Sequence, residues 1–188
     1  MPSLPDDGTV TDLAAWWLGL GPRAGDAVVL AVEGRSGSGK TTLAAALAAR
    51  VPDAAVVSMD EIYPGWDGLD ASVALLVEHV LRPIAEGRPV SVPRWDWAAD
   101  LPAPPRPLPT TRLVLVEGIG CGARDCAPYL AGMVWLQAPD ELRKRRALAR
   151  DGDAYAQHWD RWAAQEDAVY ASTRPWETAD IVVRTVAP

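Results

Sequence analysis

The chain has 188 residues, of which 49% are hydrophobic, and a formal net charge of −7 at pH 7. This length suits one domain with a sizeable core, and we expect a single domain over residues 1–188. The acidic balance argues against a nucleic-acid partner, because binding to a phosphate backbone needs clustered Lys and Arg. No apolar run approaches the roughly 20 residues that span a bilayer, and the first residues lack the basic start of a signal peptide. We therefore expect no membrane partner and a cytoplasmic location.

Helices and strands are predicted to alternate from the start of the chain. Apolar residues recur at helical spacing from Thr11 to Leu20, before Gly21-Pro22, and predict a helical extension over residues 1–24 that packs on the core. The run Ala27 to Val32 is short, β-branched and continuously apolar, which predicts a strand buried on both faces. A glycine-rich turn separates it from an alanine-rich helix over Thr41 to Arg50.

The alternation continues through the rest of the chain. Strands are predicted at Ala54 to Ser58, Leu113 to Val116, Met133 to Gln137 and Ile181 to Arg184, and helices at Ala71 to Ile84, Glu141 to Arg150 and Ala154 to Ser172. The proline-rich stretch Leu101 to Pro109 is expected to form an extended loop, with a docking segment for a polyproline-binding partner as the alternative. This order predicts the α/β class, with a parallel five-stranded sheet flanked by helices.

A phosphate-binding pattern lies between the first predicted strand and the alanine-rich helix. G-x-x-x-x-G-K-[ST] is matched in full by Gly34, Arg35, Ser36, Gly37, Ser38, Gly39, Lys40 and Thr41, and Thr42 follows. Glycines let the backbone curl around phosphate oxygens, so that successive N–H groups point at the negative charge. Lys40 can then reach the β- and γ-phosphates, and the Thr41 hydroxyl can ligate Mg²⁺. We expect a P-loop NTPase fold that uses ATP and Mg²⁺.

Two of the predicted strands end in carboxylates. Glu117 follows the apolar run Leu113 to Val116, at the point where open α/β sheets place their ligands. It can hold Mg²⁺ through water or position an acceptor, and a capping or solvated role is the alternative. Asp60 follows the second strand and can accept the proton of an acceptor hydroxyl that attacks the γ-phosphoryl group. A cap on the following turn is the alternative for Asp60.

A densely basic helix occurs in this otherwise acidic chain. Arg143, Arg146 and Arg150 recur at spacings of three and four, so one helical face could present them all to phosphate. Residues 138–155 are therefore expected to form a helical lid that stabilises transition-state charge. A solvated basic face is the alternative. No N-K-x-D motif for guanine is present, which weakens a GTPase interpretation.

On these residues the chain resembles the uridine kinase group of P-loop kinases, which includes nicotinamide riboside kinase-like and phosphoribulokinase-like enzymes. The resemblance runs from about Val28 to Val183. Four segments of the group, D-x-F-Y, E-G-I, R-x-x-R-x-x-x-R-D and A-D-I, are similar to Asp60 to Tyr63, Glu117 to Ile119, Arg143 to Asp151, and Ala179 to Ile181. The resemblance implies that Asp60 is the catalytic base.

The group's P-x-Y-D-[FWY] segment is similar to Pro93-Arg94-Trp95-Asp96-Trp97. By that resemblance Asp96 would bind ribose hydroxyls, and Trp95 or Trp97 could stack on a base. Plain packing is the alternative, since the chain has nine Trp and no Phe. The residues expected to bind the acceptor are Asp60, Tyr63, Trp95, Asp96, Glu117 and Arg143. His79 and His158 fall in predicted helices and receive no role.

The expected activity is transfer of the ATP γ-phosphoryl group to a hydroxyl of a small metabolite. Lys40, Asp60, Arg146 and Arg150 are the expected catalytic residues, Thr41 and Glu117 the expected Mg²⁺ ligands, and a nucleoside the first candidate for the acceptor. Another alcohol, such as nicotinamide riboside, pantothenate or a sugar, is the second kinase hypothesis. A nucleotide-binding accessory protein without turnover is the alternative from a different class. The expected partner is the small-molecule acceptor, and a homo-oligomer is left open.

Overall fold

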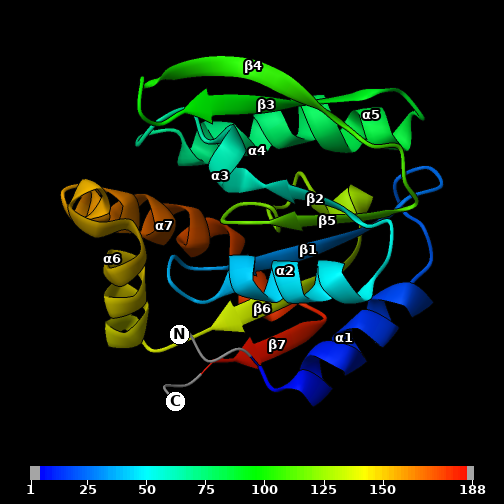
Figure 1. The fold of residues 1–188 in the computed structure, drawn as a ribbon, viewed down its shortest axis with the longest axis horizontal. Helices are drawn as coiled ribbons and strands as arrows, with labels where there is room; N and C mark the ends of the chain where they lie inside the picture. Colours follow the sequence, from blue (N-terminus) through cyan, green and yellow to red (C-terminus); the bar gives the residue numbers. More distant parts are fainter. Residues whose placement is uncertain (1–4, 186–188) are drawn as a thin grey trace.

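A parallel sheet of five strands lies at the centre of the structure, a computed structural model that describes residues 5–185 without the side chains of Asp151, Asp153 and Ala154 (Figure 1). The strand order is β2-β5-β1-β6-β7. These strands are β1 (Val28–Gly34), β2 (Ala55–Ser58), β5 (Leu113–Glu117), β6 (Leu130–Gln137) and β7 (Ile181–Arg184). Every residue of β1 is buried, as expected for a strand that is covered on both faces. The predicted α/β sheet is confirmed.

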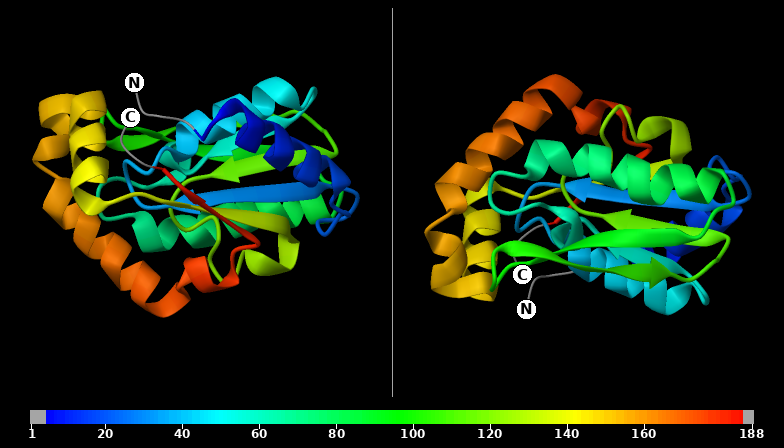
Figure 2. Two further views of the ribbon diagram at one scale, coloured as in Figure 1. Left: turned by 90° about the horizontal axis from the view of Figure 1, so that it is seen from below. Right: turned by 90° about the horizontal axis from the view of Figure 1, so that it is seen from above.

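Helices cover both faces of the sheet (Figure 2). On one face, α1 (Asp7–Gly19) and α2 (Lys40–Arg50) bury Trp17 and Leu43 against alternate residues of β1, including Leu30. On the other face lie α3 (Met59–Ile62), α4 (Leu69–Leu76), the π-helical η1 (Val77–Leu81), α5 (Arg82–Ala85) and α7 (Trp159–Thr173). The short η2 (Ala127–Tyr129) and α8 (Pro175–Thr178) connect elements, and α6 (Asp140–Ala156) follows the carboxyl end of β6.

A two-stranded antiparallel ribbon, β3 (Val90–Asp96) and β4 (Leu101–Leu108), lies outside the sheet and packs on α3 and η1 (Figure 1). The prediction of a loop at Leu101 to Pro109 is therefore wrong. Proline cannot donate to a strand ladder, but both strands of a ribbon are edge strands, on which proline is tolerated. Arg106 of β4 fastens the ribbon to the fold through two hydrogen bonds to Glu61, at 2.7 and 2.8 Å, and one to the carbonyl of Val56.

Most predicted elements are confirmed with shifted boundaries. The N-terminal helix starts at Asp7, after Asp6 caps it by accepting from the Thr9 N–H at 2.8 Å, and its Trp17 is fully buried against the core. The helix predicted from Ala154 is wrong in its first turn. α6 continues to Ala156 through a kink at Gly152, where φ is 63° and ψ is −151°, and α7 begins only at Trp159. None of the helices in the described part of the chain has the length and apolarity to cross a membrane.

Candidate active site

The loop between β1 and α2 curls through glycines with positive φ. Gly34, Gly37 and Gly39 have φ values of 151°, 75° and 105°. A Cβ on Gly37 would lie 2.1 Å from the carbonyl oxygen of Arg143, so glycine is required for α6 to approach the loop this closely. Gly39 is the N-cap of α2, and no side chain of residues 5–185 caps this helix. The first N–H groups of α2 are therefore available to a phosphate.

Lys40, Thr41 and Glu117 lie beside this helix end. The Lys40 Nζ crosses the loop and donates to the carbonyl of Arg35 at 3.2 Å. The Thr41 Oγ1 lies 3.3 Å from both carboxylate oxygens of Glu117, and the Ser58 hydroxyl donates to Glu117 at 2.6 Å. Burial raises the pKa of Glu117, while the charge of Lys40 opposes the rise and the charge of Asp60 adds to it.

A hydroxyl beside a carboxylate is an oxygen donor set that fits Mg²⁺. Thr41 and Glu117 provide it, and Lys40 lines the same cavity. Among the residues that the structure describes, no group of three or more His, Cys, Asp or Glu side chains could hold a metal ion. A magnesium ion here would therefore complete its coordination with phosphate oxygens and water, as is usual for this ion.

A cavity of about 780 Å³ opens on the P-loop side of the molecule. Lys40, Thr41, Asp60, Tyr63 and Glu117 all line it, so the structure brings these predicted site residues together. The cause is the topology, because the carboxyl ends of parallel strands meet at one edge of a sheet. Asp60 is exposed, and its N–H donates to Ser58 Oγ at 3.3 Å. Its negative charge contributes to the raised pKa of both Tyr63 and Glu117, for which burial is the main cause.

One side of this cavity is an aromatic wall, formed by Trp66, Trp97, Tyr155, His158 and Trp162. Trp66 is central: its ring stacks on His158 at 4.2 Å and on Tyr155 at 5.6 Å between centroids, and Trp97 lies 4.8 Å away. The Trp97 Nε1 donates to the carbonyl of Asp60 at 2.8 Å. This bond connects the tip of the β3–β4 ribbon to the expected base.

Trp95 also lines the cavity, and its Nε1 is buried without a hydrogen-bond partner among the described residues. A buried donor of this kind is uncommon, because leaving it unpaired costs about 1–3 kcal/mol. Asp96 is not among the residues that line the cavity. Its carboxylate accepts the N–H groups of Ala98 and Ala99 at 3.0 Å each, and so holds the turn after β3. Its expected contact with ribose stays a prediction.

A second cavity of about 480 Å³ lies between α2 and α6. It is lined by Thr42, Arg146 and Arg150, and it shares Gly37, Lys40, Thr41 and Arg150 with the first cavity. Arg146 donates to the Thr185 hydroxyl at 3.2 Å, and burial lowers its pKa. The P-loop and Arg150 thus border both cavities.

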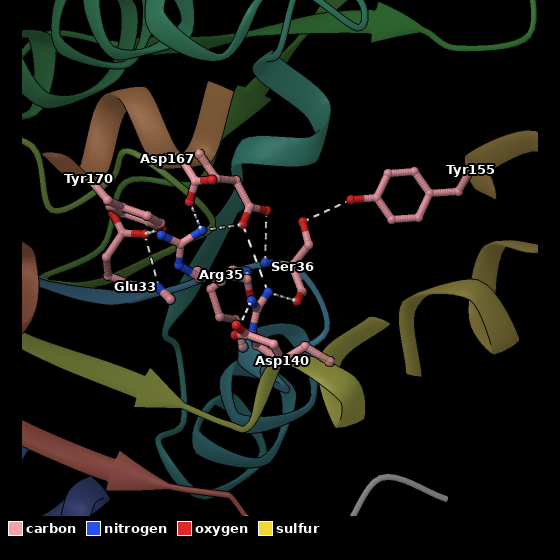
Figure 3. A network of polar contacts seen from close by, with 11 residues as sticks. Glu33, Arg35, Ser36, Asp140, Tyr155, Asp167 and Tyr170 are labelled. Atoms are coloured by element: carbon pink, nitrogen blue, oxygen red, sulfur yellow. Dashed lines mark hydrogen bonds and ion pairs between the residues drawn. The ribbon is translucent and has the colours of Figure 1, made fainter. Parts of the chain in front are cut away.

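Two predicted arginines point away from these cavities, because α6 and α7 pack against the back of the loop. Arg35 pairs with Asp167 at 2.6 Å and with Glu166 at 3.6 Å, and its guanidinium lies over the ring of Tyr170 (Figure 3). Arg143 is buried and donates to the Ser36 carbonyl at 3.1 Å and to Asp140 at 2.6 Å. Their side chains therefore support the P-loop, and in this structure Arg143 does not reach the cavity where we expected an acceptor.

Ser36 is held by three different bonds from the two helices behind the loop. Its N–H donates to Glu166 of α7 at 3.0 Å, its carbonyl accepts from Arg143, and its hydroxyl accepts from Tyr155 of α6 at 2.9 Å (Figure 3). Neither Glu166 nor Tyr155 was predicted to be part of the site. The position of the P-loop thus depends on α6 and α7.

Glu33, the residue before the loop, is a buried carboxylate that accepts four hydrogen bonds. Three come from the N–H groups of Gly34, Gly120 and Gly122 at 2.9 Å each. The fourth comes from the Tyr170 hydroxyl at 2.7 Å, and Figure 3 shows Tyr170 beside Glu33. Burial raises the pKa of Glu33, and the bonds from Gly122 and Tyr170 oppose the rise. Glu33 therefore joins β1 to the segment after β5 and to α7.

Sequence reasoning missed most of the aromatic wall. His158 received no role because it was placed inside a helix, but it lies between α6 and α7 and lines the cavity. Trp66, Tyr155 and Trp162 come from segments without a recognisable motif. The abundance of tryptophan in a chain without phenylalanine was the only signal that could have pointed to them.

No protein-family model and no curated protein matches the chain. Solved structures do. A possible uridine kinase from Bacillus stearothermophilus matches with a TM-score of 0.68 and 22% identity, over 93% of this chain and 97% of that chain. A candidate fructose transport system kinase from Silicibacter sp. TM1040 matches with a TM-score of 0.58 and 22% identity, over 95% and 98%. YFH7 from Saccharomyces cerevisiae, a candidate P-loop kinase with a circular permutation, matches with a TM-score of 0.60 and 13% identity, over 95% and 99%.

The sheet order, the phosphate-binding loop and these neighbours define the class: the chain has the fold of the P-loop kinases. Among its structural neighbours are uridine kinase-like proteins, in agreement with the resemblance seen in the sequence. At these identities the likeness concerns the fold.

Proposed function

We propose that the protein is an ATP-dependent kinase that transfers the γ-phosphoryl group to a hydroxyl of a small metabolite. The observation that carries the proposal is the shared cavity, which brings Lys40, Thr41 and Glu117 together with Asp60. Lys40, Thr41 and Glu117 are enough to hold a nucleotide with Mg²⁺. A kinase also needs a carboxylate, here Asp60, to orient the acceptor hydroxyl and to take its proton.

Each residue has a role that follows from its position. The first N–H groups of α2 and the ammonium of Lys40 would bind the triphosphate. Thr41 and Glu117 would hold Mg²⁺, which would neutralise charge on the phosphates. Asp60 orients the acceptor hydroxyl and accepts its proton. Arg150, which borders both cavities, lies where it can stabilise charge on the transferred group. Arg146 lines the second cavity, which we assign to the nucleoside part of ATP.

The aromatic wall supports an acceptor that carries a flat ring, and a nucleoside is the first candidate. Four tryptophans, Trp66, Trp95, Trp97 and Trp162, line the same cavity as Asp60. An aromatic partner of an indole ring gains stabilisation beyond the apolar area that the contact buries. Pantothenate and simple sugars have no flat aromatic ring, which makes them weaker candidates. Nicotinamide riboside has an aromatic ring and is therefore included among the compounds to be tested.

The test is ATP consumption with Mg²⁺ against a panel of nucleosides, nicotinamide riboside, sugars and vitamin alcohols. The parent chain is compared with Lys40→Ala and Asp60→Asn. Lys144→Ala and Asp12→Asn are matched controls, because these residues are exposed and outside the cavities. One acceptor should stimulate turnover, Lys40→Ala should lose ATP binding, and Asp60→Asn should keep ATP binding and lose about 100-fold or more in kcat.

The same experiment decides the alternative of a nucleotide-binding accessory protein. If the parent binds ATP but no compound of the panel stimulates turnover, and Asp60→Asn behaves like Asp12→Asn, the kinase proposal is wrong. If the parent binds no nucleotide at all, both hypotheses are wrong.

A further inference from the structure

Tyr155 touches the aromatic wall and the P-loop at the same time. Its ring is stacked on Trp66 at 5.6 Å with an interplanar angle of 19°, and packs edge-on against Trp159 at 5.6 Å. Its hydroxyl donates to the Ser36 hydroxyl at 2.9 Å (Figure 3). The residue is 6% exposed, so few other arrangements are open to its side chain while α6 stays in place. It is the point at which the acceptor side of the cavity contacts the phosphate side.

The hydroxyl of Tyr155 acts as a donor over the physiological pH range. Burial raises the pKa of this phenol well above its usual value, so it keeps its proton. The Ser36 hydroxyl accepts from it and keeps its own proton for another acceptor. A change in the position of Tyr155 would therefore displace or break its hydrogen bond to Ser36.

The helix that carries Tyr155 has a bend that could let this residue move. Arg143 and Tyr155 both bind Ser36, but they lie on opposite sides of the kink at Gly152. A Cβ at Gly152 would meet no atom of the described residues within 4 Å, so none of them wedges the kink. A short segment that absorbs a change in φ and ψ is the usual form of a hinge. The part of α6 after Gly152 can then move together with the aromatic wall, while Arg143 keeps its hydrogen bond to the P-loop.

We propose that Tyr155 is a positioning residue that couples acceptor binding to nucleotide binding. An acceptor against Trp66 keeps Tyr155 in the orientation that donates to Ser36, and this bond holds the P-loop in its phosphate-binding conformation. By thermodynamic reciprocity, phosphate on the loop orders Tyr155 and Trp66 for the acceptor. The inference rests on the proposed function, since it assumes that nucleotide binds at the P-loop.

The test uses the full chain and Mg²⁺ with a non-hydrolysable ATP analogue as the probe. Tyr155→Phe keeps the ring and removes the donor, and Ser36→Ala removes the acceptor of the same bond. Each should weaken binding of the analogue about 3- to 10-fold by calorimetry, and the double variant should bind no more weakly than the weaker single variant. Tyr129→Phe is the matched control, because Tyr129 precedes β6 at the other end of the sheet.

Tryptophan fluorescence gives a second readout, one that a loss of packing alone would not produce. The analogue should change the emission of the parent, and Trp66→Phe should remove most of that change because Trp66 is the reporter. Tyr155→Phe should also remove it at saturating analogue, although the analogue is bound. Thermal unfolding of each variant shows whether it is folded, and Ser36→Ala tests the bond from its other side.

The inference is overturned if Tyr155→Phe keeps the fluorescence response of the parent, if the parent has none while binding the analogue, or if the two single effects multiply in the double variant. A parent chain that does not bind the analogue would overturn the proposed function together with this inference. The two failures are therefore distinguishable.

Discussion

Replacing Glu33 by glutamine tests whether the buried carboxylate stabilises the fold. The two side chains have nearly the same shape, so the change leaves no cavity. In the parent, one carboxylate oxygen accepts from Gly34 and Tyr170, and the other accepts from Gly120 and Gly122. The three backbone N–H groups can only donate, whereas the amide nitrogen of glutamine cannot accept.

The magnitude follows from how few donors an amide can satisfy. The best orientation turns the glutamine oxygen toward Gly120 and Gly122, so that the amide nitrogen faces the Gly34 N–H and the Tyr170 hydroxyl must rotate to accept. One unpaired buried N–H costs about 1–3 kcal/mol, and the loss of charge assistance on the other bonds adds to this cost. Removal of a buried charge offsets part of it. We expect a net loss of about 2 kcal/mol.

The assay is thermal unfolding of the full chain at neutral pH. For a chain of this size, about 2 kcal/mol corresponds to a fall in Tm of roughly 4–8 °C. Glu78→Gln is the matched control, because Glu78 is exposed and an exposed substitution of this kind stays within about 0.5 kcal/mol. A Glu33→Gln chain that melts at or above the temperature of the parent would refute the reasoning, and would show that the desolvation cost exceeds the value of the four bonds.

The direction of the pKa shift adds a pH dependence to this prediction. Burial raises the pKa of Glu33 above its ordinary value of 4.5, so the folded state holds this proton more tightly than the unfolded state does. The contribution to stability is therefore present in full below about pH 4.5 and is lost as the pH rises through the folded pKa. A protonated carboxyl can donate to Tyr170 and still accept at both oxygens. The difference between parent and Glu33→Gln should thus be larger at pH 5 than at pH 7.5.

Two further predictions concern the cavity itself. Gly37→Ala should lower the free energy of unfolding by about 2 kcal/mol or more and weaken ATP binding, because its Cβ would lie 2.1 Å from the Arg143 carbonyl oxygen and its φ is 75°. Gly21→Ala, at an open position, is the control and should change neither quantity. Unfolding and ATP-binding measurements on both variants check this. Because the pKa of Glu117 is raised, this carboxylate loses its negative charge at a higher pH than an ordinary glutamate does, so the Mg²⁺-dependent part of ATP binding should fall as the pH is lowered. Calorimetry with and without Mg²⁺ should show this fall in the parent, whereas Glu117→Gln should show the weakened Mg²⁺ effect already at pH 7.5. A Mg²⁺ effect that Glu117→Gln leaves unchanged at pH 7.5 would exclude Glu117 as a ligand.

The part of the site that could be predicted from sequence is the part that contiguous patterns specify. The P-loop is one uninterrupted motif, and β1 is a continuous apolar run, so both are local signals. Asp60 and Glu117 are far apart in sequence, but each lies at the carboxyl end of a strand of one parallel sheet. Their proximity therefore follows from the fold class, and the structure places both in one cavity with Lys40.

The part that could not be predicted depends on how α6 and α7 pack. The spacing of Arg143, Arg146 and Arg150 predicts one basic face, yet Arg143 lies under the P-loop while Arg150 lines the cavities. Periodicity identifies which residues share a face, but the neighbour of that face is set by tertiary contacts. The kink at Gly152, which carries Tyr155 into the aromatic wall, has no periodic signal either.

The carboxylates behind the P-loop explain how it can keep its shape before a phosphate arrives. The N–H groups of such a loop converge, and each must find an acceptor. Glu33 accepts from Gly34 and Glu166 accepts from Ser36, so the first half of the loop is anchored to the protein. The second half ends in a helix whose N-terminus has no side-chain cap among the described residues. The first half of the loop is thus bonded to the rest of the protein, and the second half offers its N–H groups to a ligand. Ser36 lies at the boundary between the two halves, and through its bonds α6 and α7 can affect nucleotide binding.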